Sequence, residues 1–185
     1  MKTKLVLTYL FLTLILIGCK EEVTLPKPKA MLRLEYEKPP METAETKYFT
    51  FDYNALAQLN IKNSTAIAIR YPDMKAAVFM SYRKVNDDIK KLTTDAQKLS
   101  YEHAAKADGI RPRAYEDPTN KVYGAFFEVS GDAASQAQFY VTDSLNHFVT
   151  GSLYFETRPN YDSIYPAAVY LQNDMGRIME TLRWK

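Results

Sequence analysis

The chain has 185 residues, which suits one domain with a tail, and 46% of them are hydrophobic, enough for a packed core. Its 24 basic and 22 acidic side chains give a net charge of +2, so it lacks the basic excess typical of nucleic-acid binders. One Cys, two His and six Gly exclude a disulfide framework, a multi-cysteine zinc site and a glycine-rich phosphate loop, and we predict no metal or other cofactor.

Residues 1–18 have the features of a signal peptide. Lys2 and Lys4 precede an apolar run that is shorter than the ~20 residues of a membrane-spanning helix. The run ends in Leu16-Ile17-Gly18-Cys19, which resembles the bacterial lipobox. We therefore predict cleavage before Cys19 and lipidation of its thiol and amine, by diacylglycerol and by an acyl chain such as palmitate. Such an anchor is permanent, because each buried CH₂ contributes ~0.8 kcal/mol. Cleavage also leaves equal numbers of basic and acidic side chains.

Residues 19–46 are predicted to be a tether. They contain four of the nine prolines, which fix φ and remove hydrogen-bond donors, so we expect an extended segment. Alternating residues at 31–36 predict a short edge strand within it.

We expect the anchored chain at the outer membrane, facing the periplasm. Lys20-Glu21-Glu22 resembles the export signal of surface lipoproteins, which leaves exposure at the cell surface open.

Residues 47–185 are predicted to form a single globular domain. Alternating aromatic residues from Phe49 predict a strand, and apolar runs predict two more at Ala66–Tyr71 and Ala76–Tyr82. The short connection between the last two favours an antiparallel hairpin. Because Ala76–Tyr82 is apolar on both faces, we expect both faces of this strand to be covered.

A helix is predicted from Asn86 or Asp87 to about Ala107. Either residue can cap its N-terminus, and Gly109 is placed to end it. The residues with helical spacing, which form the predicted buried stripe, are Ile89, Leu92, Ala96, Leu99 and His103.

Three strands and a final helix complete the predicted elements. The strands Val122–Val129, Ala134–Val141 and His147–Glu156 are separated by short turns, which predicts an antiparallel meander. The helix would be capped by Ser163 and hold Pro166 in its first turn. Its predicted apolar stripe is Ile164, Ala168, Leu171, Met175, Ile178 and Leu182. The order predicts an α+β fold, a mainly antiparallel sheet packed by two helices, and is similar to the PsbP/Mog1 sandwich.

Two histidines are the first candidates for chemistry. His103 follows the stripe of the first helix and suits a general base, a ligand or a buried structural histidine. His147 opens a strand after a turn, so we expect it to be exposed. Asp132 and Ser135 lie in a turn, but no G-x-S-x-G pattern surrounds the serine.

Two Asp-Ser pairs have competing interpretations. Asp143 and Ser144 predict an Asx-type turn, and Ser163 follows Asp162 at the start of the last helix. The same strings, Asp-Ser-Leu and Asp-Ser-Ile, resemble O-glycosylation acceptors. Turn and capping roles explain both pairs without a glycan.

Aromatic residues are abundant. Thirteen of 14 tyrosines follow the signal peptide, together with eight phenylalanines and Trp184. Tyrosine is enriched at interfaces because it joins an apolar face to a polar tip, so we predict an aromatic interaction surface. Antiparallel strands also favour tyrosine, which leaves core packing as the alternative.

Several strings together resemble the gliding motility lipoprotein GldD family of the Bacteroidetes, from about Lys47 to the C-terminus. They are Leu99-Ser100-Tyr101-Glu102-His103 with Lys106-Ala107-Asp108, Lys121-Val122-Tyr123-Gly124, Gly131-Asp132-Ala133-Ala134-Ser135, Gln138-Phe139-Tyr140-Val141-Thr142-Asp143-Ser144, His147-Phe148, Gly151 to Phe155, Arg158-Pro159-Asn160-Tyr161-Asp162-Ser163 and Met179-Glu180-Thr181-Leu182-Arg183-Trp184-Lys185.

The resemblance implies an envelope lipoprotein without known enzymatic activity. It would assemble or stabilise other proteins of the gliding machinery and the linked type IX secretion system, and its partners would be those proteins and the membrane that holds Cys19. Candidate binding or structural residues are His103, Lys106, Asp108, Asp132, Ser135, Tyr140, Asp143, His147, Arg158 and Asn160.

Two alternatives stay open. One is a ligand- or glycan-binding lipoprotein with a Tyr-lined pocket near His103 and residues 131–135. The other is a hydrolase of envelope polymer that uses His103 with Asp132 or Ser135, which requires these groups within hydrogen-bond reach of one point.

Overall fold

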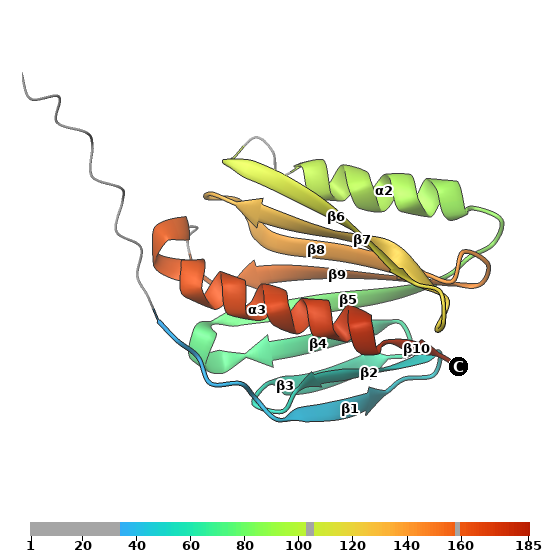
Figure 1. Ribbon diagram of the computed structural model, residues 1–185, viewed down its shortest axis with the longest axis horizontal. Coiled ribbons are helices and arrows are strands. Elements are labelled where there is room, and N and C mark those ends of the chain that lie inside the picture. Colours follow the sequence, from blue (N-terminus) through green and yellow to red (C-terminus); the bar gives the residue numbers. More distant parts are fainter. Residues whose placement is uncertain (1–33, 103–105, 158–159) are drawn as a thin grey trace, which may run out of the picture. The chain divides into compact units, whose positions relative to one another are not determined.

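The computed structural model describes residues 34–102, 106–157 and 160–185, which belong to one compact unit (Figure 1). The signal peptide, Cys19, His103 and Arg158 lie outside the described residues. In this part of the chain the first elements are β1 (Met41–Glu45), β2 (Phe49–Asn54), β3 (Gln58–Asn63), β4 (Ala66–Tyr71), the 3₁₀ helix η1 (Pro72–Met74), β5 (Ala76–Lys84) and α2 (Ile89–Tyr101). They are followed by β6 (Gly109–Asp117), β7 (Val122–Ser130), β8 (Ser135–Thr142), β9 (His147–Phe155), α3 (Tyr161–Thr181) and β10 (Arg183–Trp184).

The strands form two antiparallel sheets. The larger has the order β3-β4-β5-β9-β8-β7-β6, and the smaller has the order β1-β2-β10. The predicted hairpin is confirmed as β4 and β5, and the predicted meander as β7, β8 and β9. The α+β class with two packing helices is therefore confirmed, although the strands divide between two sheets. The likeness to a PsbP/Mog1 sandwich stays a prediction.

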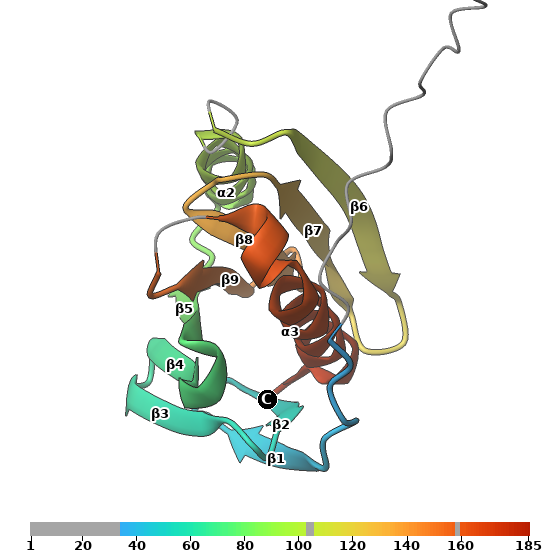
Figure 2. The same cartoon turned by 90° about the vertical axis from the view of Figure 1, so that its left-hand side faces the viewer.

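Helix α3 packs against β2 of the small sheet and against β7 and β8 of the large sheet (Figure 2). Ala168, Leu171, Met175 and Ile178 of the predicted stripe are at most 1% exposed, and Leu182 just beyond the helix is fully buried. Leu171, Met175, Ile178 and Leu182 share one hydrophobic core with Phe49 and Phe51 of β2 and the inward residues of the large sheet. Burial of each large apolar side chain contributes roughly 1.5–3 kcal/mol.

Helix α2 covers part of the opposite face of the large sheet. Leu92 is buried there in a second core with Val85, Phe127, Tyr140 and Phe148. The helix ends at Tyr101 rather than near Ala107, and Leu99 is 43% exposed, so the predicted helix end and this member of the stripe were wrong. Among the described residues, no helix is both long and apolar enough to cross a membrane.

The sheet face beside α2 is left partly uncovered. Phe79 of β5 points to this face and is 41% exposed, so the prediction that both faces of the strand are covered was wrong. Its ring lies 6.1 Å from that of Tyr154 on β9. The second face of the large sheet therefore presents aromatic surface to solvent.

Four strands, β1, β3, β6 and β10, were not predicted, because their apolar residues are too few to mark a strand. β3 and β6 are edge strands with mostly exposed side chains, and β6 begins at Gly109, which was predicted to end a helix. β1 lies inside the 19–46 range predicted to be a tether and pairs with β2. No strand occurs at Leu34–Tyr36, the described half of the predicted 31–36 strand.

At Gly124 of β7, the backbone of β8 lies too close to leave room for a side chain. A Cβ at this position would collide with the backbone carbonyl oxygen of Tyr140 and lie 2.9 Å from its carbon. We expect Gly124→Ala to lower the free energy of unfolding by about 1–3 kcal/mol, because the strands must move apart. Urea unfolding measures the change.

Gly176 provides the matched control. A Cβ there has no neighbouring heavy atom within 4 Å, so Gly176→Ala should stabilise α3 by up to about 1 kcal/mol through helix propensity. Equal urea midpoints for Gly124→Ala and the wild-type chain would contradict the packing of these strands.

Candidate functional site

The first of the described candidate residues lie between α2 and β6. Lys106 and Asp108 are both exposed, and the backbone N–H of Asp108 donates to the carbonyl of Ser130 at 2.8 Å. Gly131 follows with φ of +95°, and a Cβ there would meet the Asp108 backbone nitrogen at 2.5 Å. Asp108 thus lies against the turn that leads into β8.

The N-terminus of α3 brings two further candidates together. The Asp132 Oδ1 accepts a hydrogen bond from the Tyr161 backbone N–H at 2.8 Å, and the Asn160 carbonyl accepts from Ser163 and Ile164. A carboxylate is favourable here, because the first N–H groups of a helix lack intrahelical acceptors and carry partial positive charge. The helix begins at Tyr161, so the predicted cap at Ser163 was wrong, and Pro166 lies in the second turn instead of the first.

A groove of about 740 Å³ opens between this helix and the edge of the large sheet. We call it the α3 groove. Residues 109–113 of β6 and 128–130 of β7 line one side, and Tyr161, Tyr165, Val169, Gln172 and Asn173 of α3 line the other. The volume lies in the ~300–1,000 Å³ range of ligand sites. Through Ser130 the groove adjoins the turn at residues 131–134, which leads into β8.

Charges at the groove are nearly balanced. Glu128 pairs with Arg113 at 2.7 Å and with Arg111 at 3.7 Å, and the Arg111 side chain is 80% exposed.

Tyr161 packs edge-on against Tyr165, with 5.6 Å between ring centroids. Burial raises the pKa of Tyr161, so its hydroxyl stays protonated and able to donate at neutral pH.

Ser135 and Tyr140 have structural positions. Ser135 is fully buried, and its hydroxyl donates to the Ala137 carbonyl at 3.2 Å. Tyr140 stacks on Phe148 with 5.6 Å between ring centroids, and its hydroxyl accepts from Gln97 at 3.4 Å. A buried hydroxyl cannot contact a polymeric substrate, so the structure argues against Ser135 as the nucleophile of a hydrolase.

Asp143 organises the loop between β8 and β9. Its Oδ1 accepts from the backbone N–H groups of Leu145, Asn146 and His147 at 3.0, 2.7 and 2.8 Å. Burial by itself would raise the pKa of Asp143, but the three N–H donors outweigh it and hold the pKa below its ordinary value. The predicted Asx-type turn is confirmed. Ser144 is exposed with φ of +69°, and glycosylation there stays a prediction.

His147 lies in an aromatic cluster that we define as Tyr48, Phe49, Tyr82, His147 and Trp184. The imidazole stacks on the Trp184 indole with 5.1 Å between centroids, and its Nδ1 is 2.9 Å from the Tyr82 hydroxyl. His147 is half-buried, so the prediction of an exposed histidine was wrong. The Trp184 Nε1 donates to the Lys121 carbonyl at 3.0 Å, which joins β10 to the turn between β6 and β7.

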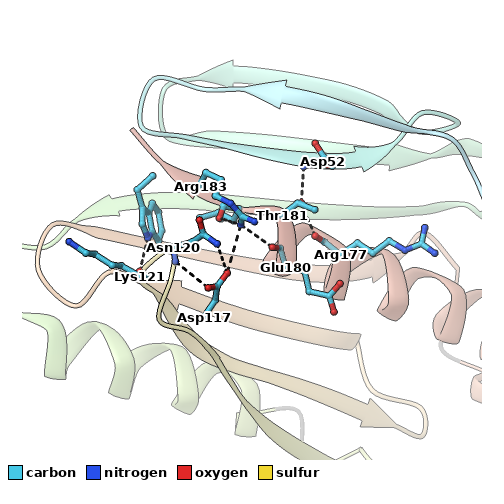
Figure 3. A network of polar contacts seen from close by, with 10 residues as sticks. Asp52, Asp117, Asn120, Lys121, Arg177, Glu180, Thr181 and Arg183 are labelled. Atoms are coloured by element: carbon cyan, nitrogen blue, oxygen red, sulfur yellow. Dashed lines mark hydrogen bonds and ion pairs between the residues drawn. The ribbon is translucent and has the colours of Figure 1, made fainter.

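A polar network holds the C-terminal end of α3 in place (Figure 3). Thr181 accepts from the Asp52 backbone N–H at 2.9 Å and donates to the Arg177 carbonyl at 2.8 Å. Arg183 donates to the Glu180 carbonyl at 2.9 Å and lies 4.0 Å from the Asp117 carboxylate. The network connects β2, α3 and the β6–β7 turn.

Asp174 forms a buried polar site that the sequence analysis missed. The residue is 3% exposed, and its carboxylate accepts from the Asn54 amide at 2.7 Å. Burial raises the pKa of Asp174, while the Asn54 hydrogen bond and the nearby Arg177 oppose the rise. The only sequence signal was an acid one position before Met175 of the predicted stripe, which did not identify Asn54 as its partner.

Within residues 34–102, 106–157 and 160–185, no group of three or more His, Cys, Asp or Glu side chains is placed to hold a metal ion.

The structure brings Asp132 and Asn160 together at the N-terminus of α3, and Asp108 lies beside the same turn. His147 lies in a separate cluster.

Comparison with known proteins identifies a family. The family model described as gliding motility lipoprotein GldD matches residues 21–184 of the chain. No curated protein matches the chain.

Asp143 should stabilise the loop through its charged form. We expect Asp143→Ala to lower the free energy of unfolding by about 1–3 kcal/mol at pH 7, because three N–H groups lose their acceptor. Asp143→Asn keeps a neutral acceptor and should cost less. Because the folded-state pKa is depressed, the advantage of wild type over Asp143→Asn should disappear as the pH falls below 3.8, as urea titrations at pH 7 and pH 3 will show. An unchanged advantage at pH 3 would contradict this role.

Asp174 should show the opposite pH dependence. Its folded-state pKa is raised above 3.8, so its ionised form opposes folding at neutral pH and the penalty disappears as the pH falls toward 3.8. We expect Asp174→Asn to gain stability relative to wild type, and to gain more at pH 7 than at pH 4. Thermal unfolding at both pH values measures this difference, and a gain that is larger at pH 4 would refute the argument.

Proposed function

The chain belongs to the gliding motility lipoprotein GldD family, and on this basis we propose that it assembles or stabilises the gliding machinery and the linked type IX secretion system. The observation that carries the proposal is the family match over residues 21–184. Membership of the family gives the chain a role in gliding motility and an association with the cell envelope. The proposal adds how it acts, through contacts with other proteins of the machinery and without catalysis.

The proposed anchor is lipid on Cys19, after removal of residues 1–18. The lipobox-like sequence and the description of the family as lipoproteins both support this chemistry. We place the chain at the outer membrane with its domain in the periplasm. The proposed partners are the membrane, through the lipid, and other envelope proteins of the gliding and secretion machinery.

The positions of the candidate polar residues support a role without catalysis. The Asp132 carboxylate accepts a hydrogen bond from the first backbone N–H of α3. The Asp143 carboxylate accepts from three backbone N–H groups. The Ser135 hydroxyl is buried and donates to a neighbouring carbonyl. Each of these groups has a structural partner, which accounts for its place in the chain without a reaction.

The α2 side of the large sheet supports protein contacts. Phe79 of β5 and Leu99 of α2 are 41% and 43% exposed. Tyr101 of α2 is 50% exposed and packs instead on Phe127 of β7. Tyr154 packs beside Phe79. Exposed aromatic and aliphatic side chains that cluster on one face are typical of interaction sites.

Gene replacement in the source bacterium tests the proposed function. We expect deletion to abolish gliding on agar, to reduce type IX secretion, and to lower the steady-state amounts of other proteins of the machinery. The wild-type gene should restore all three. Cys19→Ser removes the thiol that is lipidated, so it should fail to restore them and should leave the chain outside the membrane fraction.

Lys20→Ala is the matched control, because it changes the adjacent residue and leaves the cysteine intact. It should restore gliding and membrane association. Unchanged gliding and secretion in the deletion strain would overturn the proposed function. Full activity of a non-lipidated Cys19→Ser chain would overturn the proposed anchor.

A further inference from the structure

The α3 groove is lined by chemical groups of several kinds. An aromatic surface from Tyr161 and Tyr165 lies along α3, and ion-paired side chains from β6 and β7 line the other side of the groove. We propose that this groove binds a neutral oligosaccharide. The inference goes beyond the assembly role and rests on the groove alone.

Polar groups of α3 are available to a ligand. The Tyr165 hydroxyl and the side-chain amide of Asn173 make no hydrogen bond to another described residue, and both residues line the groove. Gln172 uses its Nε2 to donate to the Gln136 carbonyl at 3.0 Å, which leaves its amide oxygen free to accept. Donors and acceptors therefore occur side by side, as a ligand with many hydroxyl groups requires.

The charge pattern disfavours strongly charged ligands. Arg113 and Glu128 neutralise each other at 2.7 Å, and Arg111 adds one exposed positive charge. The Glu128 carboxylate would repel a polyanionic chain. The guanidinium groups of Arg111 and Arg113 would repel a polycationic chain. An apolar helix would bury the ion pair without new hydrogen bonds, which costs free energy.

The edge strand also disfavours a peptide that adds to the sheet. β6 forms the outer edge of the large sheet, and Pro112 lies in its middle between Arg111 and Arg113. Proline lacks the N–H that strand addition uses, and charged neighbours are a common protection of edges. The groove is therefore better suited to a ligand held by side chains.

A sugar chain satisfies each feature of the lining. The C–H face of a pyranose packs on the electron-rich face of a tyrosine ring such as Tyr165. Its hydroxyl groups donate to the oxygens of Glu128 and Gln172 and accept from the amide of Asn173. The volume of about 740 Å³ and the open side of the groove suit several linked sugar units.

The test uses the full-length lipidated chain in micelles of lauryldimethylamine oxide, a detergent without sugar. Saturation-transfer NMR with maltotriose, cellotriose and N,N′,N″-triacetylchitotriose, all neutral, detects contact between protein and sugar protons. We expect transfer to at least one trisaccharide. Tyr165→Ala should weaken its binding by about tenfold, and Asn173→Ala by about threefold to tenfold.

Asn173 is exposed, so its replacement leaves the fold intact even if Tyr165→Ala destabilises α3. Tyr154→Ala is the matched control, because it removes a tyrosine outside the groove, and should bind like wild type. Transfer to none of the three sugars, unchanged binding by both groove variants, or displacement of the sugar by hexaglutamate would each overturn the inference, the last in favour of an acidic peptide.

The outcome is separable from the proposed function. A chain that binds no sugar but restores gliding overturns only the saccharide site. A chain that binds sugar through the groove, but whose deletion leaves gliding and secretion intact, overturns only the assembly role.

Discussion

Burial of one face of α3 is the interaction on which the rest of the structure depends. Leu171, Met175 and Ile178 share a single core with the inner faces of both sheets. β2 of the small sheet and β7 and β8 of the large sheet contact the same helix. Because each large apolar side chain contributes roughly 1.5–3 kcal/mol, loss of this face would remove the common packing surface of the two sheets.

The position of α3 along its axis is set by polar contacts at both ends and in the middle. Asp132 binds the first N–H of the helix, and Thr181 links its last turn to β2 (Figure 3). Between them, Asp174 is held in the core by Asn54. A buried carboxylate is costly unless it is paired, so this contact selects one placement of the helix. The α3 side of the groove is therefore presented in a fixed orientation.

The two surfaces of the domain have different chemistry. The α2 side of the large sheet exposes Phe79 and Leu99, which suits contact with another protein. The α3 groove combines tyrosine rings, amides and a balanced ion pair, which suits a hydroxyl-rich ligand. Because α2 and α3 cover opposite faces of the large sheet, one chain offers both surfaces at the same time.

Local pattern determined much of this protein. The family, the β7–β9 meander, the α3 stripe and the Asp143 turn were all predictable, because each depends on residues close together in sequence. The edge strands β3 and β6 were not predicted, because they bury few side chains and so carry too few apolar residues to stand out. Tertiary structure alone decided that Asp132 meets Tyr161 and that Asp174 meets Asn54, 29 and 120 positions away. Such pairings follow from how α3 packs on the two sheets, and that packing places the groove.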